Sequence, residues 1–194
     1  MKIPSSQENP IDVANIWLCD KLCPVFRSLK MSANHITTLS LIFGVISLVF
    51  LWKYNWIAFA ITYYISYMFD CMDGHYARKY KIVSKFGDYY DHIKDVIVVI
   101  GLILILIIRY KAPVKIWLIF TFIMVIFTVL MIAHLGCQEK LYPHDESPAL
   151  NKSKILCPGN ATKNIQYTKW FGCGTWTLIM IFSVLLLNRN RIIH

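Results

Sequence analysis

Residues Phe69–Asp95 read FDCMDGHYARKYKIVSKFGDYYDHIKD and contain almost half of the acidic residues in the chain. The aspartates are Asp70, Asp73, Asp88, Asp91 and Asp95. The stretch lies between two strongly apolar runs, so these residues fall where one helix ends and the next begins. Helical spacing of three or four residues places Asp70 and Asp73 on one face, and Asp91 and Asp95 on another. Two antiparallel helices meeting there would bring four carboxylates into one pocket and leave the fifth outside.

The rest of the chain is apolar enough to lie in a membrane. Of its 194 residues, 57% are hydrophobic and 16% are charged, whereas about a quarter of the residues in a soluble domain are charged. Apolar spans, each about 25–30 Å long as a helix, are predicted at 36–53, 56–72, 92–109, 115–135 and 171–187. We predict one all-α integral membrane domain over 1–194, a polytopic bundle of five to six transmembrane helices.

Three segments outside these spans complete the predicted organisation. Residues 10–30 have apolar side chains three and four positions apart, from Ile11 to Leu29, which predicts an amphipathic helix at the membrane interface. A helix packed on a soluble partner is the alternative. The short connection Lys53–Asn55 predicts an antiparallel hairpin of the first two spans. Residues 136–170 are polar and contain several prolines, so we expect a loop there, although a sixth helix could lie within it.

Charge gives the predicted orientation. The net charge of +9 suits anionic lipids, and the basic residues flank the spans, which favours the positive-inside rule over a nucleic-acid partner. The basic residues of the N-terminal arm and those after the second span place the N-terminus and the aspartates on the cytoplasmic face. Arg109, Lys111 and Lys115 fall on the other face and weaken this assignment. Lys94 could bind a phosphate of the substrate, but a headgroup anchor is the preferred interpretation.

The remaining sequence signals are interpreted as incidental. The N-terminus has no apolar core with a cleavage site, so we expect no cleaved signal peptide. Six cysteines without CxxC spacing predict no disulfide framework. Asn151 and Asn160 begin N-x-S/T sequences, but a cytoplasmic loop would not be glycosylated, so chance is the preferred explanation.

The aspartate pocket requires cations. Four bare carboxylates in a membrane would cost on the order of 10 kcal/mol. Oxygen ligands at this density suit Mg²⁺ or Mn²⁺, with phosphate oxygens of a substrate in the remaining positions. Gly74 and Gly87 leave room for a ligand near the backbone, and the guanidinium of Arg78 matches phosphate oxygens. The pattern therefore predicts metal-assisted phosphoryl transfer.

These residues also resemble a known family signature. Asp70-x-x-Asp73-Gly74-x-x-Ala77-Arg78, then eight residues, then Gly87-x-x-x-Asp91-x-x-x-Asp95 looks like the pattern of the class I CDP-alcohol phosphotransferases. The segment Ser32–Gly44 resembles the family's approach to its first span, with Ala33-Asn34 where a Pro-Asn pair is usual. The resemblance covers about residues 10–135 and puts the catalytic core spans at 36–135. It fades beyond them, where members usually have six membrane helices.

The resemblance implies transfer of a phospho-group from a CDP-linked donor to an alcohol, with release of CMP, in phospholipid synthesis. The donor would be CDP-diacylglycerol or a CDP-amino alcohol, and the acceptor a small alcohol or a lipid. It also implies two bound Mg²⁺ or Mn²⁺ ions and leaves a homodimer open. By similarity, the metal ligands are Asp70, Asp73, Asp91 and Asp95. Asp95 would also be the base on the acceptor hydroxyl. The cytidine diphosphate would contact Gly74, Ala77, Arg78 and Gly87.

Other functions remain alternatives at this stage. A non-catalytic membrane protein could retain the aspartates as a structural divalent-metal site. An ion transporter is disfavoured because its acidic residues would be expected near mid-membrane. Within the enzyme class, Val96 follows Asp95 where relatives that use phosphorylated acceptors often carry a basic residue, which slightly favours an amino alcohol or another small alcohol.

Overall fold

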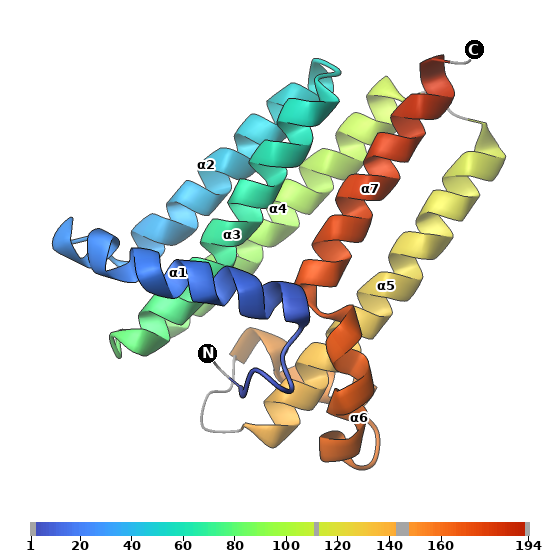
Figure 1. Ribbon diagram of the computed structural model, residues 1–194. Helices are drawn as coiled ribbons and strands as arrows, with labels where there is room; N and C mark the ends of the chain where they lie inside the picture. Colours follow the sequence, from blue (N-terminus) through green and yellow to red (C-terminus); the bar gives the residue numbers. More distant parts are fainter. Residues whose placement is uncertain (1–2, 111–112, 143–147, 193–194) are drawn as a thin grey trace.

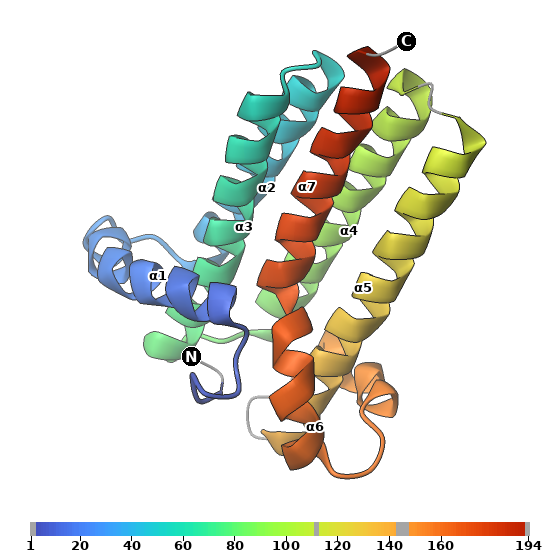
Figure 2. The same cartoon turned by 45° about the vertical axis from the view of Figure 1, so that its right-hand side comes forward.

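The computed structural model describes residues 3–110, 113–142 and 148–192, and over these ranges the chain forms helices and no β-strand. The elements are α1 (Pro10–Ser28), α2 (Ala33–Trp52), α3 (Trp56–Lys79), α4 (Lys85–Arg109), α5 (Val114–Leu141), η2 (Pro148–Leu156), α6 (Ala161–Thr168), η3 (Lys169–Phe171) and α7 (Cys173–Ile192). The helices α2, α3, α4, α5 and α7 run side by side as a bundle (Figures 1 and 2). The predicted all-α class is confirmed.

Apolar side chains fill the bundle and also cover its outside. One buried residue from each long helix illustrates the core, namely Leu51, Phe59, Leu102, Met124 and Val184. Large apolar side chains of α4, α5 and α7 are also exposed, among them Ile97, Ile100, Leu104, Leu118, Phe122 and Phe182. Helices that are apolar on every side are typical of a membrane-embedded bundle.

Within the described ranges, three segments are long and apolar enough to cross a membrane: Ala33–Trp52, Val114–Leu141 and Ala161–Leu187. The predicted span 56–72 forms the first part of α3 and the predicted span 92–109 forms the last part of α4. Residues 73–79 extend α3 beyond its span, and residues 85–91 precede the span of α4. Their extensions carry the charged motif, which lowers their apolar character. The motif therefore lies on helical extensions at one end of the bundle.

The predicted α2–α3 hairpin is confirmed, and its turn shows why it is tight. The backbone N–H of Asn55 donates to the carbonyl oxygen of Phe50 at 2.9 Å, and the side chain of Asn55 caps α3 by accepting from Ala58 N at 3.2 Å. Tyr54 adopts a positive φ of 59°. A capped helix start directly after a left-handed residue reverses the chain within three residues.

The helix α1 crosses the end of the bundle where α3 finishes and α4 begins (Figure 1). Its buried residues are Asp12, Asn15, Ile16, Cys19 and Cys23. The predicted apolar stripe is not the buried face of the helix, because Leu18, Val25 and Leu29 are exposed. An exposed apolar stripe on a helix that lies across a bundle end agrees with an interfacial position.

Two expectations for residues 136–170 were wrong. The first is the loop, because α5 continues to Leu141 and the described part of the segment is mostly helical, with η2 and α6 following. The helix α6 has eight residues and is about 12 Å long, too short to cross a membrane. The second is the absence of disulfides, because Cys137 and Cys157 are bonded. Their pairing depends on the return of η2 onto α5, which cysteine spacing alone does not predict.

Candidate active site

The aspartate motif is built where α2, α3 and α4 converge. Ser84 caps α4 by accepting from Gly87 N at 3.0 Å, and so fixes where that helix begins. Two reciprocal hydrogen bonds join α2 to α3: Ser40 Oγ donates to Ser66 O at 2.9 Å, and Ser66 Oγ donates to Ser40 O at 2.7 Å. These contacts fix α2 against α3 beside the aspartates and set where α4 begins.

The two helices bring the predicted carboxylates together. One oxygen from each of Asp70, Asp91 and Asp95 lies within 4.8 Å of the others. Asp73 lies on the same helix as Asp70 but outside this group, and it is 5% exposed. Among the described residues, its Oδ2 atom has no hydrogen-bond partner. Asp95 is the most open of the set, with a side chain that is 53% exposed.

This arrangement fits a divalent cation. All the donors are carboxylate oxygens, which are the ligands that Mg²⁺ and Mn²⁺ prefer. A buried carboxylate oxygen without a partner, as in Asp73, is costly unless something outside the protein satisfies it. A cation with open positions for substrate phosphates meets both conditions.

Lys94 is buried in the bundle and does not serve as a headgroup anchor. Its side chain is 1% exposed and does not reach the membrane surface, so the headgroup-anchor prediction was wrong. The ammonium group contacts Asp70 directly, and Nζ lies 3.1 Å from Asp91 Oδ1 and 2.9 Å from Asp95 Oδ1. Lys94 also donates to Ser40 Oγ at 3.1 Å. The sequence does carry a signal for this buried position, because Lys94 lies close to Asp91 and Asp95 on an apolar helix.

The predicted nucleotide-contact residues lie around this cluster. The guanidinium of Arg78 lies over Gly74, where an added Cβ would meet its nitrogens at 3.3 Å and 3.4 Å. A Cβ at Gly87 would lie 3.0 Å from the side-chain oxygen of Asn34 at the start of α2. Ala77 lies on α3, three residues after Gly74. The two glycines therefore allow close approach of protein side chains, and roles in binding a nucleotide remain predictions.

Ion pairs at the edge of the site attach α1 to α3. Asp20 accepts from Lys79 Nζ at 2.7 Å and pairs with His75 Nε2 at 2.9 Å. The pairing with Asp20 gives His75 a structural role. Asp88 lies outside the aspartate group, as predicted, in the first turn of α4. These contacts fix the end of α3 without adding ligands to the cluster.

A second polar group lies where α1, α5 and α7 meet. Gln138 Nε2 donates to Glu8 Oε1 at 3.2 Å and lies 2.9 Å from His134 Nε2. Asp12 accepts from the backbone N–H of Gly174 at 3.4 Å. Burial, with a smaller contribution from the negative charge of Glu8, raises the pKa of Asp12 to about 8. This group has no signal in the sequence, because it depends on how α1 crosses the bundle.

The raised pKa of Asp12 predicts a pH dependence of stability. Its folded pKa of about 8 exceeds the ordinary value of 3.8, so the folded state keeps a proton that the unfolded state has lost. Stability should therefore fall as the pH rises from about 4 to about 8. Asp12→Asn should reduce this fall, measured as melting temperature in detergent between pH 5 and pH 9. Asp20→Asn is the control, because hydrogen bonds from Lys79 and His75 lower the Asp20 pKa to about 2. Identical profiles for wild type and Asp12→Asn would contradict the assignment.

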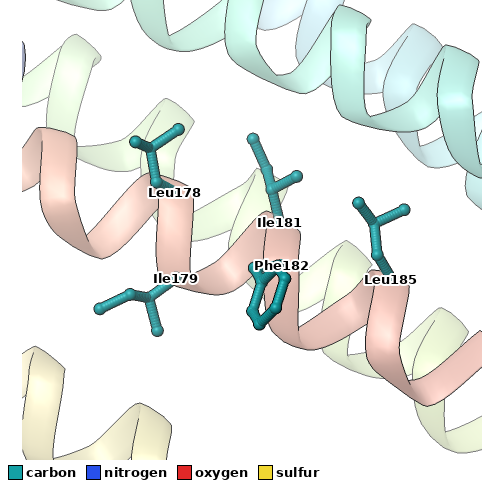
Figure 3. A pocket seen from close by; sticks show the side chains of 5 residues that line it. All are labelled: Leu178, Ile179, Ile181, Phe182 and Leu185. Carbon is teal, nitrogen blue, oxygen red and sulfur yellow. The ribbon is translucent and has the colours of Figure 1, made fainter.

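The described surface also has an apolar depression on α7 that none of the aspartates lines (Figure 3). Its lining residues are Leu178, Ile179, Ile181, Phe182 and Leu185. None of these side chains can donate or accept a hydrogen bond, so the depression cannot recognise a charged nucleotide. The polar chemistry of the bundle lies at the end where α1 crosses it.

Comparison with known proteins agrees with the motif. A family model described as CDP-alcohol phosphatidyltransferase matches residues 30–193. The match extends well past residue 135, where the resemblance was expected to fade, and it begins after the end of α1, although the resemblance was expected from about residue 10. No curated protein and no solved structure matches the chain.

Proposed function

Because the chain belongs to the CDP-alcohol phosphatidyltransferase family, we propose that it transfers a phospho-group from a CDP-linked donor to an alcohol and releases CMP. Membership of this family supports phosphotransfer from a CDP-alcohol, in phospholipid synthesis, as the reaction of this chain. The observation that carries the proposal for this chain is the meeting of Asp70, Asp91 and Asp95 oxygens within 4.8 Å at the end of two helices. All the motif residues that such a reaction requires are present.

Divalent metal dependence is general in this family, and the aspartate cluster has the ligands for it. We propose that Asp70, Asp73 and Asp91 hold Mg²⁺ or Mn²⁺, with Asp95 at the edge of the same site. When bound, the metal would neutralise negative charge on the donor's phosphates and so make the phosphorus more electrophilic. The unpartnered Oδ2 atom of Asp73 supports a ligand role for that residue.

We assign the proton transfer to Asp95. It is the most exposed of the four aspartates, so an acceptor hydroxyl can reach it. Asp95 takes the hydroxyl proton as the acceptor oxygen bonds to the phosphorus that carries the retained alcohol, and the bond from that phosphorus to the CMP oxygen breaks. A carboxylate is a weak base toward an alcohol, so positioning of the reactants must supply much of the acceleration. Arg78 would hold phosphate oxygens of the donor.

The donor and acceptor can be identified by a substrate panel. Purified protein with Mg²⁺ or Mn²⁺ would be given CDP-diacylglycerol or a CDP-amino alcohol, each with several acceptors, and CMP release measured. We expect one donor class to turn over, with an amino alcohol or another small alcohol favoured over a phosphorylated acceptor. Asp91→Asn gives the background. Turnover with a phosphorylated acceptor alone would contradict the acceptor assignment.

We propose that the aspartate cluster faces the cytoplasm, although two observations point in opposite directions. Basic residues are concentrated at the cluster end of the bundle, including Arg27, Lys81 and Lys85, which the positive-inside rule places in the cytoplasm. The Cys137–Cys157 disulfide lies at the same end, and disulfides persist mainly in oxidising compartments. The basic residues carry the assignment of the cytoplasmic face, because several of them lie at the cluster end of the bundle.

Labelling can decide the orientation. Lys81→Cys places a thiol in the exposed turn between α3 and α4. In sealed membrane vesicles whose cytoplasmic face is outward, a membrane-impermeant maleimide added outside should label it, while Lys53→Cys at the opposite turn should stay unlabelled. The reverse pattern would place the cluster on the other face. Glycosylation of Asn160 in the cells from which the vesicles are made would support that reverse result.

A further inference from the structure

We propose that the ammonium group of Lys94 occupies one of the cation positions of the aspartate cluster, so that without nucleotide the site binds one divalent ion per chain rather than two. The inference rests on the proposed function, because it concerns how the same cluster holds its metal. It assigns a role to a residue outside the family motif. The role is that of a built-in competitor for the carboxylates.

The position of Lys94 supports this role. Its Nζ atom contacts three carboxylates from two helices, Asp70 on α3 and Asp91 and Asp95 on α4. These are the residues whose oxygens lie within 4.8 Å of one another. The ammonium group thus lies among the same oxygens that would otherwise ligate a cation. Lys94 is 1% exposed, so solvent does not compete with these carboxylates for its ammonium group.

The α2 helix holds the lysine in place. Lys94 donates to Ser40 Oγ, and Ser40 in turn donates to the carbonyl oxygen of Ser66 on α3. The hydroxyl of Ser40 is therefore oriented with its lone pairs toward the ammonium group. This support from a third helix distinguishes Lys94 from a surface lysine that pairs with whichever carboxylate is nearest.

Asp73 shows where the divalent ion remains. It is the one motif aspartate that makes no ion pair with Lys94 among the described residues, and its buried Oδ2 atom has no hydrogen-bond partner. A buried carboxylate oxygen left in this way points to a ligand. Lys94 and one divalent ion would together provide cationic partners for the carboxylates of all four aspartates.

Repulsion from Lys94 favours one ion over two. As metal ligands the four aspartates are ionised and carry four negative charges, of which Lys94 offsets one. A single divalent ion leaves a net charge of about −1, whereas two would leave about +1. In a site of low dielectric, adding a second dication beside a fixed ammonium group is unfavourable unless anionic substrate enters with it. Neutralising Lys94 should therefore open a second position.

Manganese counting tests the inference without using activity. Wild type, Lys94→Met and Lys94→Arg would be purified in detergent without nucleotide, and bound Mn²⁺ counted by electron paramagnetic resonance of the free ion. We expect one Mn²⁺ per chain in wild type and in Lys94→Arg, and two in Lys94→Met. Lys79→Met is the matched control, expected to bind one ion, because Lys79 pairs with Asp20 outside the cluster.

The outcomes separate this inference from the proposed function. Two Mn²⁺ per wild-type chain, or one ion with unchanged affinity in Lys94→Met, would overturn the role of Lys94 and leave the metal site standing. No Mn²⁺ binding by any folded protein would overturn the metal site itself. If Lys94→Met does not fold, the wild-type and Lys94→Arg counts still decide, since two ions in wild type contradict the inference.

Discussion

Asp95→Asn is expected to lower CMP release by at least about 100-fold, the range that a positioned general base contributes. The amide cannot accept the proton of the acceptor hydroxyl at neutral pH. Metal-dependent binding of the CDP donor should be largely retained, because Asp70, Asp73 and Asp91 remain. The measurement pairs a CMP-release assay with donor binding at saturating Mn²⁺.

The matched control for Asp95→Asn is Asp88→Asn. Asp88 lies on the same helix, in the first turn of α4 and outside the aspartate group. Loss of an acidic residue from a helix start costs about 0.3–1 kcal/mol of stability, but CMP release should stay close to the wild-type rate. If Asp95→Asn turned over as fast as Asp88→Asn, the assigned base would be wrong.

Asp73→Asn is expected to make the chelated protein more stable and the enzyme inactive. The substitution removes a buried carboxylate whose Oδ2 atom has no partner among the described residues, so the folded state no longer bears its desolvation cost. The melting temperature in EDTA should rise, by about 2–4 °C for each kcal/mol gained. Mn²⁺ affinity and CMP release should both fall, since a ligand is lost.

Asp20→Asn is the control for the expected rise in melting temperature and the expected fall in Mn²⁺ affinity. Asp20 is half exposed and pairs with Lys79 and His75, so its loss should not raise the melting temperature or change Mn²⁺ affinity. Wild-type Mn²⁺ affinity in Asp73→Asn would show that Asp73 is not a ligand. A lower melting temperature in EDTA would show that its carboxylate supports the fold.

The helices and the meeting of the carboxylates could be predicted because both depend on local spacing. Apolar runs of sufficient length become helices wherever they lie, and aspartates three or four residues apart share a face. The short turn at Lys53–Asn55 fixed the direction of the second helix relative to the first. Once α3 and α4 were known to be adjacent and antiparallel, Asp70 and Asp91 had to lie near each other.

The features that escaped prediction depend on contacts between distant segments. Lys94 has the same local pattern as a lysine that reaches for a lipid headgroup, and only the packing of α4 against α2 and α3 turns it inward. The Cys137–Cys157 bond requires η2 to fold back on α5. The buried state of Asp12 requires α1 to cross the bundle next to α7. None of these arrangements has a periodic signal in the sequence.

Metal-dependent CMP release from a CDP-linked donor is the most direct test of the proposed function. The purified full-length chain would be incubated with CDP-diacylglycerol or a CDP-amino alcohol and an alcohol panel, with Mn²⁺, with EDTA, and with Mn²⁺ restored after EDTA. We predict release of CMP with at least one donor and acceptor pair, its loss in EDTA and its return with Mn²⁺. A folded protein that binds Mn²⁺ but releases no CMP with any pair would contradict the enzyme assignment and favour a structural metal site.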